Sequence, residues 1–448
     1  MPTPRAGPAI EERRDDRVRL EARRHRRGVV EERVDGGLRV QLGQRRQHLL
    51  AAAPRHQPVV NEGHPHPTSD TAPPRESRHP ARARGYSDLL VKVVIDLRMV
   101  RGPLHGIARY ALELARRIPP LEPGWQFVGL TGPDGVPGDL GALAPRIPLV
   151  RCSADFLAPL EQPALAATLL KQRPDLFHAT SFSVPALWSG PLVATIHDAN
   201  HLALNESRSR TRTAYYQLVV GPRARRAKAL ITVSEFSRGE VSRHLNLAPE
   251  RLQVIGNGVD ASFRVPPDSE LEDFRARRGL PTRYFAAIGS LKAHKNLGVL
   301  QPIATSLPAP LALLAGRGAR RALGFDESIL ELSPLPDVDL VRFYAGAVGV
   351  LVPSYYEGFG LPALEAMACG GPVVAADAGA HPEVVGAAGL LVPAHDPQAW
   401  KTACQRLFRD DELRASLSAA GVARAARFSW DDCAQKTLQV YRRALGMR

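Results

Sequence analysis

The 448-residue chain is poor in cysteine and has no long hydrophobic run. Its four cysteines are scattered and form neither a CxxC pair nor the spacing of a metal site. A reduced, cytoplasmic setting is therefore the default expectation. The longest apolar runs fall well short of the roughly 20 residues that a membrane-spanning helix needs. With 44% hydrophobic residues, the composition is that of a globular protein long enough for two domains.

Residues 1–90 lack lysine and nearly lack aromatic residues. They contain 18 Arg, 12 acidic residues and a single aromatic residue, so this segment supplies +6 of the net charge of +14. No sustained helical or strand period runs through it, and we expect residues 1–88 to be disordered or a non-native extension. A secretory signal is not expected because no apolar core follows the charges, and the acids argue against a transit peptide.

The remainder carries short apolar runs separated by helical patterns. The run Leu89–Ile95 predicts a first central strand, which a glycine-bearing loop and a helix starting near Gly106 follow. Further runs of this kind are Phe127–Leu130, Leu176–Ala179, Leu192–Ile196, Ala229–Val233, Leu252–Ile255, Tyr284–Ile288 and Leu311–Leu314. This order of strands and helices predicts an α/β fold with doubly wound parallel sheets.

One stretch, from Glu357 to Glu365, holds two carboxylates separated by glycines, a proline and apolar residues. The preceding run Val348–Pro353 is typical of a buried parallel strand, and the spacing from Pro362 onward predicts a helix ending at Gly370-Gly371. Glu357 then lies in the strand-to-helix loop, and Glu365 lies about one turn into the helix. Backbone N–H groups at such a helix start bind anions, and carboxylates accept hydrogen bonds from hydroxyls, so the stretch indicates a nucleotide-sugar site.

Other polar residues also lie where strands are expected to end. His197-Asp198 follows the strand run 192–196, at the edge where ligands of open α/β sheets bind, although a hydrogen-bonded loop histidine is the alternative. Lys295 lies in a strand-to-helix loop and suits a diphosphate, although most lysines are simply exposed. Ser234 is expected to cap a helix.

The pair Asp337-Val-Asp339 needs a separate interpretation. Two carboxylates at this spacing can hold a divalent cation beside a diphosphate. They also precede a helical pattern, Leu340–Ala347, so a helix N-cap with an acidic first turn explains them more simply. We therefore expect no metal at this pair.

Two basic clusters lie in the first half of the ordered chain, at residues 208–212 and 223–228. A solvated helix face is the simpler interpretation. The alternative is docking to an anionic membrane surface, where each basic residue adds about 1 kcal/mol. Nucleic acid is not expected as a partner, because aromatic residues do not interleave with the basic ones.

Taken in order, these motifs resemble those of the retaining glycosyltransferases of family four. The resemblance spans about residues 91–446 and rests on Asp96 with Gly106–Tyr110, His197-Asp198, Val233–Ser237, Val254–Asp260, Gly289–Asn296, Glu357–Glu365 and Phe428–Trp430. It implies a GT-B architecture, in which two Rossmann-like domains face a central cleft. The expected parts are an acceptor-binding domain (89–262), a linker (263–282), a nucleotide-sugar-binding domain (283–427) and a helix (428–448) that returns to the first domain. From its pattern alone, that helix could equally pack on its own domain.

The resemblance also implies roles for individual residues. Glu365 would hold the ribose hydroxyls, and Glu357 and His197 would contact the donor sugar as the catalytic residues. The diphosphate would lie against Lys295 and under the Gly106 loop. The donor site would be completed by Ser290, Asn296, Gly358, Phe359, Gly360 and Leu361. Many family members carry arginine where this chain has Ser290 or His294, so Lys295 is expected to be the only full positive charge on the leaving group.

The expected reaction is transfer of a hexose with retention and without a metal or other cofactor. A mannosyl donor linked to guanosine diphosphate is the best match, because the loop Ser290–Asn296 resembles that of bacterial mannosyltransferases of polysaccharide biosynthesis. The acceptor would be a glycan or lipid-linked saccharide, at the inner face of the plasma membrane. The alternatives are a nucleotide-sugar epimerase of similar fold and a catalytically silent nucleotide-sugar-binding protein.

Overall fold

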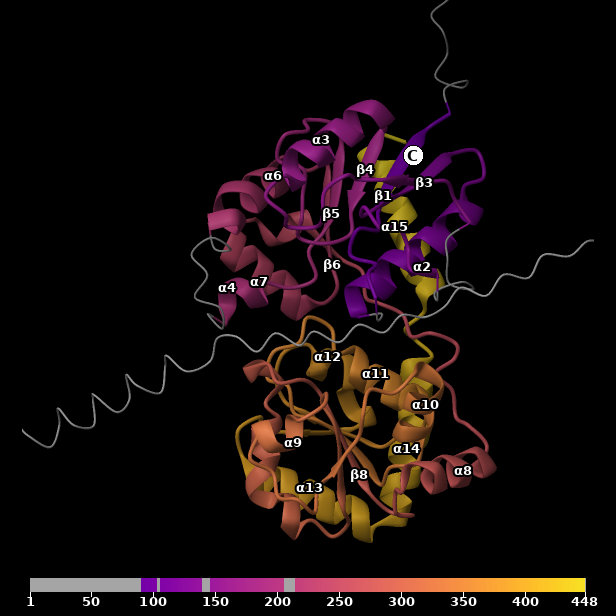
Figure 1. The fold of residues 1–448 in the computed structure, drawn as a ribbon, viewed down its shortest axis with the longest axis vertical. Coiled ribbons are helices and arrows are strands. Elements are labelled where there is room, and N and C mark those ends of the chain that lie inside the picture. The colour runs from indigo at the N-terminus through magenta and orange to yellow at the C-terminus, as the bar shows by residue number, and fades with distance from the viewer. Residues whose placement is uncertain (1–89, 103–104, 139–145, 205–213, 448) are drawn as a thin grey trace, which may run out of the picture. The chain divides into compact units, whose positions relative to one another are not determined.

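The structure is a computed structural model that describes residues 90–102, 105–138, 146–204 and 214–447. Within them the strands form two sheets, in which neighbouring strands pair in parallel. The first has the order β3-β2-β1-β4-β5-β6-β7 and the second the order β10-β9-β8-β11-β12-β13. Figure 1 shows the first sheet with the indigo to magenta helices and the second with the orange to yellow ones.

The first sheet is built from β1 (Lys92–Asp96), β2 (Gln126–Thr131), β3 (Leu149–Arg151), β4 (Leu176–Ala179), β5 (Leu192–Thr195), β6 (Ala229–Thr232) and β7 (Leu252–Val254). Its helices are α2 (Gly106–Leu121), α3 (Glu161–Gln172), α4 (Asn200–Ala203), α6 (Gly221–Arg226) and α7 (Glu235–Leu245), with a π-helical turn at Tyr216–Val220 and a 3₁₀ turn at Pro249–Arg251. Most of these strands are buried, because hydrophobic clusters cover both faces of the sheet.

The second sheet comprises β8 (Phe285–Ile288), β9 (Leu311–Leu314), β10 (Leu330–Glu331), β11 (Gly349–Val352), β12 (Val373–Ala376) and β13 (Leu390–Val392). Its helices are α8 (Asp268–Arg278), α9 (Ala319–Ala322), α10 (Asp337–Ala345), α11 (Leu361–Ala368), α12 (His381–Val385), α13 (Pro397–Arg409) and α14 (Asp411–Ala425), with 3₁₀ turns at Ala293–Lys295, Leu297–Ser306 and Gly386–Ala388. Two parallel sheets of this kind confirm the predicted α/β class.

The last helix, α15 (Trp430–Ala444), packs on the first sheet although it follows the second in the chain. Figure 1 shows it in yellow beside α2 and β1. Its Trp430 and Tyr441 are buried in the same cluster as Tyr110, and the Tyr441 hydroxyl lies 2.6 Å from Nδ1 of buried His178. The expected return to the first domain is confirmed. The alternative, packing on the preceding domain, is wrong.

The chain crosses between the sheets at two adjacent places. The segment after β7 pairs with the segment before α15 through a bridge between Val259 and Ser429. At Gly258 a Cβ would lie 2.1 Å from the backbone N of Trp430, so this close crossing requires glycine. The linker expected over 263–282 is not irregular throughout, because it contains helix α8, which Arg342 ties to Glu270.

Several short elements lie outside the sequence-based prediction. The strands β3, β10, β12 and β13 have two to four residues, too few for an unambiguous period. The helix expected after Lys295 is a 3₁₀ segment, Leu297–Ser306, with Pro302 inside it. No helix in the described residues is long and apolar enough to cross a membrane.

Candidate active site

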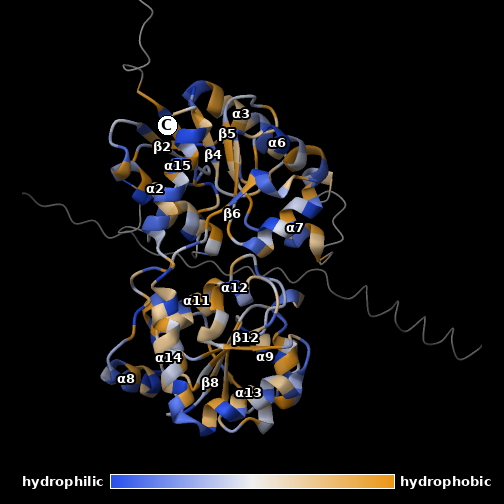
Figure 2. Ribbon diagram, turned by 180° about the vertical axis from the view of Figure 1, so that it is seen from behind, coloured by the Kyte–Doolittle hydropathy of each residue, from blue (hydrophilic) through white to orange (hydrophobic). Residues whose placement is uncertain are grey.

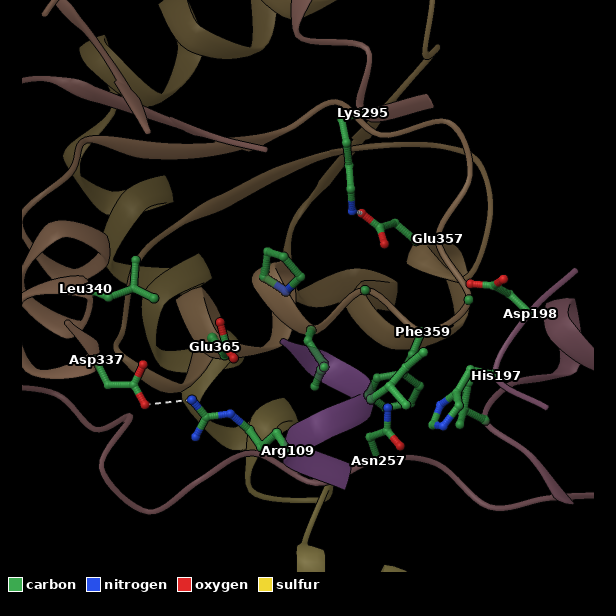
Figure 3. A pocket seen from close by; sticks show the side chains of 17 residues that line it. Arg109, His197, Asp198, Asn257, Lys295, Asp337, Leu340, Glu357, Phe359 and Glu365 are labelled. Atoms are coloured by element: carbon green, nitrogen blue, oxygen red, sulfur yellow. Dashed lines mark hydrogen bonds and ion pairs between the residues drawn. The ribbon is translucent and has the colours of Figure 1, made fainter. Parts of the chain in front are cut away.

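A cavity of about 320 Å³ lies between the carboxyl ends of the two sheets (Figure 3). Gly106, Arg109, His197, Asp198 and Asn257 contribute to its lining from the first domain. The second domain contributes Lys295, Asp337, Leu340 and the segment from Glu357 to Pro362, with Glu365. The structure thus brings most of the predicted site residues into one cavity.

The segment from Glu357 to Glu365 connects β11 to α11 as predicted. Gly360 precedes the helix with φ +95°, a left-handed conformation that favours glycine, and a Cβ there would lie 3.0 Å from the His381 ring. No side chain caps this end of α11, and Leu361 and Pro362 line the cavity. Pro362 has no N–H group, and the N–H groups of Ala363 and Leu364 donate to the Gly360 carbonyl, at 3.1 and 3.2 Å. The helix start therefore offers the Leu361 N–H group and the positive end of its dipole to an anion.

Glu357 and Lys295 form an ion pair at one end of the cavity, with Oε1 and Nζ 2.6 Å apart. Burial alone would raise the pKa of Glu357, but the Lys295 charge and hydrogen bond, together with His381, lower it overall. The Glu357 side chain is therefore a carboxylate at neutral pH. A diphosphate entering the cavity would meet a lysine already aimed at the loop.

Glu365 lies at the other end of the cavity, in the second turn of α11. Burial raises its pKa to about 7, against the lowering effect of Arg109. Asp337 and Asp260 raise the pKa further, while the nearby Tyr344 hydroxyl lowers it. Glu365 therefore titrates near neutral pH, unlike Glu357.

His197 is fixed by a hydrogen bond from Nε2 to the Thr180 carbonyl oxygen, 3.0 Å away. A carbonyl can only accept, so Nε2 carries the proton and Nδ1 is left as an acceptor. Burial and the nearby His105 lower the pKa of His197 to about 4, and the ring packs edge-on against Tyr110. His197 is thus neutral at pH 7 and can accept a hydrogen bond from a sugar hydroxyl.

The loop before α11 is joined to the first domain by direct hydrogen bonds. The Gly358 carbonyl accepts from the Ser234 and Ser237 hydroxyls, at 2.5 and 2.9 Å. Ser234 also caps α7 as predicted. Across the same junction, the Glu383 carboxylate accepts from the backbone N–H groups of Glu235 and Phe236, both at 2.9 Å. The two domains are therefore held together around the cavity.

Two expected donor-site residues are absent from the cavity lining. The Asn296 side chain donates to the carbonyls of Pro353 and Ala394, at 3.1 and 2.7 Å, and so holds the lysine loop in place. Ser290 belongs to the same loop but does not line the cavity among the described residues. In this arrangement Asn296 supports Lys295 indirectly.

Arg109 and Asp337 are site residues that the sequence-based reasoning missed. Arg109, from α2, donates through Nη2 to Asp337 Oδ2 at 2.6 Å, and both line the cavity. The cavity is therefore lined by a second full positive charge besides Lys295, while the expectation that Lys295 is the only one on the leaving group stays a prediction. The segment Gly106–Tyr110 held the signal, but helical spacing alone could not show which face Arg109 lies on.

The two aspartates at 337 and 339 have separate arginine partners. Asp337 starts α10 after Pro336, so the acidic first turn is present but the expected side-chain N-cap is not. Asp339 pairs with Arg278 and Arg342, at 2.5 and 3.1 Å. Within the described residues, no group of three or more His, Cys, Asp or Glu side chains is arranged to hold a metal.

Comparisons with known proteins agree with this geometry. The family model "Glycosyltransferase Family 4" matches residues 104–263, and "Glycosyl transferases group 1" matches residues 272–424. The chain is 31% identical to O-antigen chain mannosyltransferase B of Escherichia coli over 383 residues, which cover 79% of this chain and 100% of that protein. It is 33% identical over 284 residues to a D-inositol 3-phosphate glycosyltransferase of Corynebacterium diphtheriae, covering 57% of this chain and 66% of that protein.

Solved structures show the same fold at lower identity. Sucrose-phosphate synthase from Thermosynechococcus elongatus matches with a TM-score of 0.65 at 21% identity, over 80% of this chain and 99% of that one. HepE from Anabaena, in complex with UDP and glucose, matches with a TM-score of 0.64 at 21% identity, over 78% of this chain and 99% of that one. The chain therefore has the GT-B fold and belongs to glycosyltransferase family four, where it is related to bacterial mannosyltransferases.

Proposed function

We propose that this glycosyltransferase transfers a mannosyl residue from GDP-mannose, with retention of configuration, to a lipid-linked or polysaccharide acceptor. The observation that carries the proposal is the uncapped start of α11, with the Lys295–Glu357 pair at one end of the cavity and Glu365 at the other. Along one cavity, this arrangement offers hydrogen-bonding and charged groups for a diphosphate, a sugar and a ribose. Mannose and a surface polysaccharide are inferred from the related Escherichia coli O-antigen chain mannosyltransferase B.

In the proposed complex, the ribose hydroxyls donate to Glu365 and the diphosphate lies at the start of α11 beside Lys295. The donor sugar lies between Glu357 and His197, whose Nδ1 accepts from a hydroxyl. The acceptor hydroxyl attacks the anomeric carbon from the same side as the leaving group. The bond from this carbon to the phosphate oxygen breaks, and the acceptor proton passes to that oxygen.

Charge separation is the main barrier in this reaction. The leaving diphosphate gains negative charge, which Lys295 and the α11 dipole stabilise in a cavity from which domain closure excludes water. Each well-placed donor contributes about 3 kcal/mol, as oxyanion-hole deletions indicate. We propose that these groups suffice for catalysis without a metal.

The acceptor is proposed to approach along a membrane surface. The basic cluster at 223–228 covers the end of α6 and the two residues that precede β6, and Leu218 in the preceding turn is 76% exposed. The second basic cluster, at 208–212, lies outside the described residues. We propose that the first domain binds anionic lipid peripherally through this basic region, at the cytoplasmic face.

The proposal is tested by a thermal-shift panel of nucleotide sugars, followed by product analysis with a membrane extract. Stabilisation by GDP-mannose, acceptor-dependent mannosyl transfer and an α-linked product are expected. A free, epimerised nucleotide sugar formed without acceptor would instead indicate an epimerase. Donor binding without turnover in any extract would indicate a binding protein.

A further inference from the structure

Arg109 reaches the cavity from the domain opposite to Glu365. Its side chain is only 9% exposed, and its guanidinium lies over the Phe263 ring, 5.7 Å from the ring centre. Nη2 donates to Asp337, and Figure 3 shows the guanidinium between Asp337 and Glu365. Arginines are usually exposed, so solvation at the surface does not explain a buried arginine that reaches from one domain into a cavity lined by both.

Glu365 is surrounded mainly by groups that disfavour its negative charge. The carboxylates of Asp337, from α10, and Asp260, from the segment after β7, repel it. The hydroxyl of Tyr344, also from α10, lowers the pKa of Glu365, and the Cys369 thiol lies close to Glu365 at the end of α11. Among the described groups that shift the pKa of Glu365, Arg109 of α2 is the one with a positive charge.

The ion pair between Arg109 and Asp337 exists only while the domains are together, because α2 and α10 belong to different sheets. Domain closure therefore brings a positive charge to Glu365, and opening removes it. A carboxylate can accept hydrogen bonds from both ribose hydroxyls, whereas a protonated acid has less acceptor capacity. The state of Glu365 is thus coupled to the position of Arg109.

We propose that Arg109 is a positioning residue for the nucleotide, which favours the ionised form of Glu365 and orients it toward the ribose once the domains have closed. This inference rests on the proposed assignment of the ribose to Glu365. It gives the first domain a part in nucleotide binding that is exerted through Glu365. It also predicts opposite effects for two neighbouring substitutions.

The experiment measures the Kd of GDP by calorimetry from pH 5.5 to 8.5 with the full chain. In the unaltered protein, GDP binding is expected to weaken below about pH 7, where Glu365 becomes protonated. Arg109→Gln removes the stabilising cation and should displace this transition upward by about one pH unit. Asp337→Asn removes a repelling carboxylate and should displace it downward, while Arg109→Lys should keep it close to the original.

The control ligand is 2′,3′-dideoxy-GDP, which keeps the ionisable phosphates but lacks the ribose hydroxyls. Its binding should not show the displacement in any variant. If Arg109→Gln weakened GDP binding equally at every pH, Arg109 would be merely structural and the inference would be overturned. If the unaltered protein bound no GDP at all, the proposed function would fail first and the inference with it.

Discussion

The ion pair between Lys295 and Glu357 sets the chemistry at the sugar end of the cavity. Both side chains are mostly buried, so neither charge is well solvated without the other. In the donor complex Lys295 faces a second anion, the diphosphate, and its charge is then shared. Lys295 thus balances the negative charge of Glu357 before the donor arrives, and it balances the charge that develops on the phosphate during the reaction.

We expect Lys295→Ala to lower kcat by about 100-fold, because the leaving diphosphate loses a charged donor worth about 3 kcal/mol. The measurement is steady-state kinetics with the best donor from the binding panel. Lys292→Ala is the matched control, since Lys292 is an exposed lysine of the same loop that does not line the cavity. Equal rates for the two variants would contradict the role of Lys295.

Glu365 predicts a second effect, on stability. Its pKa is raised to about 7, so between the unfolded value and pH 7 the folded protein holds a proton that the unfolded chain releases. Stability therefore falls as pH rises through this window, and above pH 7 the buried charge costs about 2 kcal/mol. Glu365→Gln should raise the melting temperature of the ligand-free protein at pH 8 and change it little at pH 4.5.

The same Glu365→Gln protein should bind GDP more weakly at pH 8, because the amide offers one acceptor atom in place of two. Calorimetry checks this on the samples used for melting. A variant that is both more stable and weaker in binding is the signature of a functional residue held at a cost in stability. Lower stability at pH 8 would mean that Glu365 is held by its partners rather than strained by burial.

At the residue scale the sequence predicted those groups that stand in loops at strand ends. Glu357, Lys295 and His197 follow buried strands, and that edge of a parallel sheet is where ligands bind. Arg109 could not be predicted in this way, because it lies inside a helix and a helix pattern does not show which partner faces it. That Asn296 does not line the cavity could not be predicted either, because its side-chain hydrogen bonds go to loops far away in the sequence.

At the scale of elements, the contact between the first domain and the loop that precedes α11 depends on Gly358, which has no side chain. A Cβ at Gly358 would lie 2.7 Å from the His197 carbonyl oxygen and 3.0 Å from the Asp198 Cβ. The same glycine accepts the hydroxyls of Ser234 and Ser237. The close approach of the His197-Asp198 segment to this loop therefore requires glycine at position 358.

We expect Gly358→Ala to prevent full closure and to reduce kcat/KM by at least about tenfold, because a misplaced donor loop loses productive geometry. Each domain should keep its own fold, since the clash lies between the domains. Kinetics and far-UV circular dichroism measure the two effects. Gly298→Ala is the control, because a Cβ there meets nothing within 4 Å. If both variants lost the same activity, the close contact at Gly358 would not be what domain closure requires.

The strands show why element prediction was only partly successful. Runs such as Leu176–Ala179 and Leu311–Leu314 coincide with β4 and β9, because strands buried on both faces leave an unbroken apolar run. The three-residue strands β3 and β13 leave no such run and are defined by their pairing partners. Helix α8 is rich in charged residues, so its composition indicated a linker although Phe274 is buried in the core.

At the scale of the whole molecule, α15 connects the two halves, because it follows the second domain in the chain and packs on the first sheet. Its amphipathic pattern was visible in the sequence, but two faces could have received it. The choice depends on buried partners such as His178, which bonds to both Tyr441 and Thr195. Such tertiary contacts cannot be read from the periodicity of one helix.

The outer layer of the first domain carries features suited to a membrane surface. Helices α3 and α6 pack in the same hydrophobic cluster on one face of the first sheet, and Figures 1 and 2 show them as neighbours. Leu160 at the start of α3 is 70% exposed and Leu218 before α6 is 76% exposed. Arg226 and Lys228 are exposed nearby, and neither forms an ion pair within the part of the chain that the structure describes.

We expect the protein to co-sediment with vesicles that contain anionic phospholipid and not with purely zwitterionic ones. Replacing Arg226 and Lys228 with glutamate should weaken binding to anionic vesicles by several kcal/mol, at about 1 kcal/mol for each charge removed or reversed. Leu218→Ser should weaken it less and at any salt concentration, because its contribution is hydrophobic. The charge-matched control, Arg317→Glu with Arg321→Glu, alters exposed arginines of the second domain and should leave vesicle binding nearly unchanged. If both double variants lost binding equally, the attraction would reflect net charge alone, and the first domain would have no dedicated membrane surface.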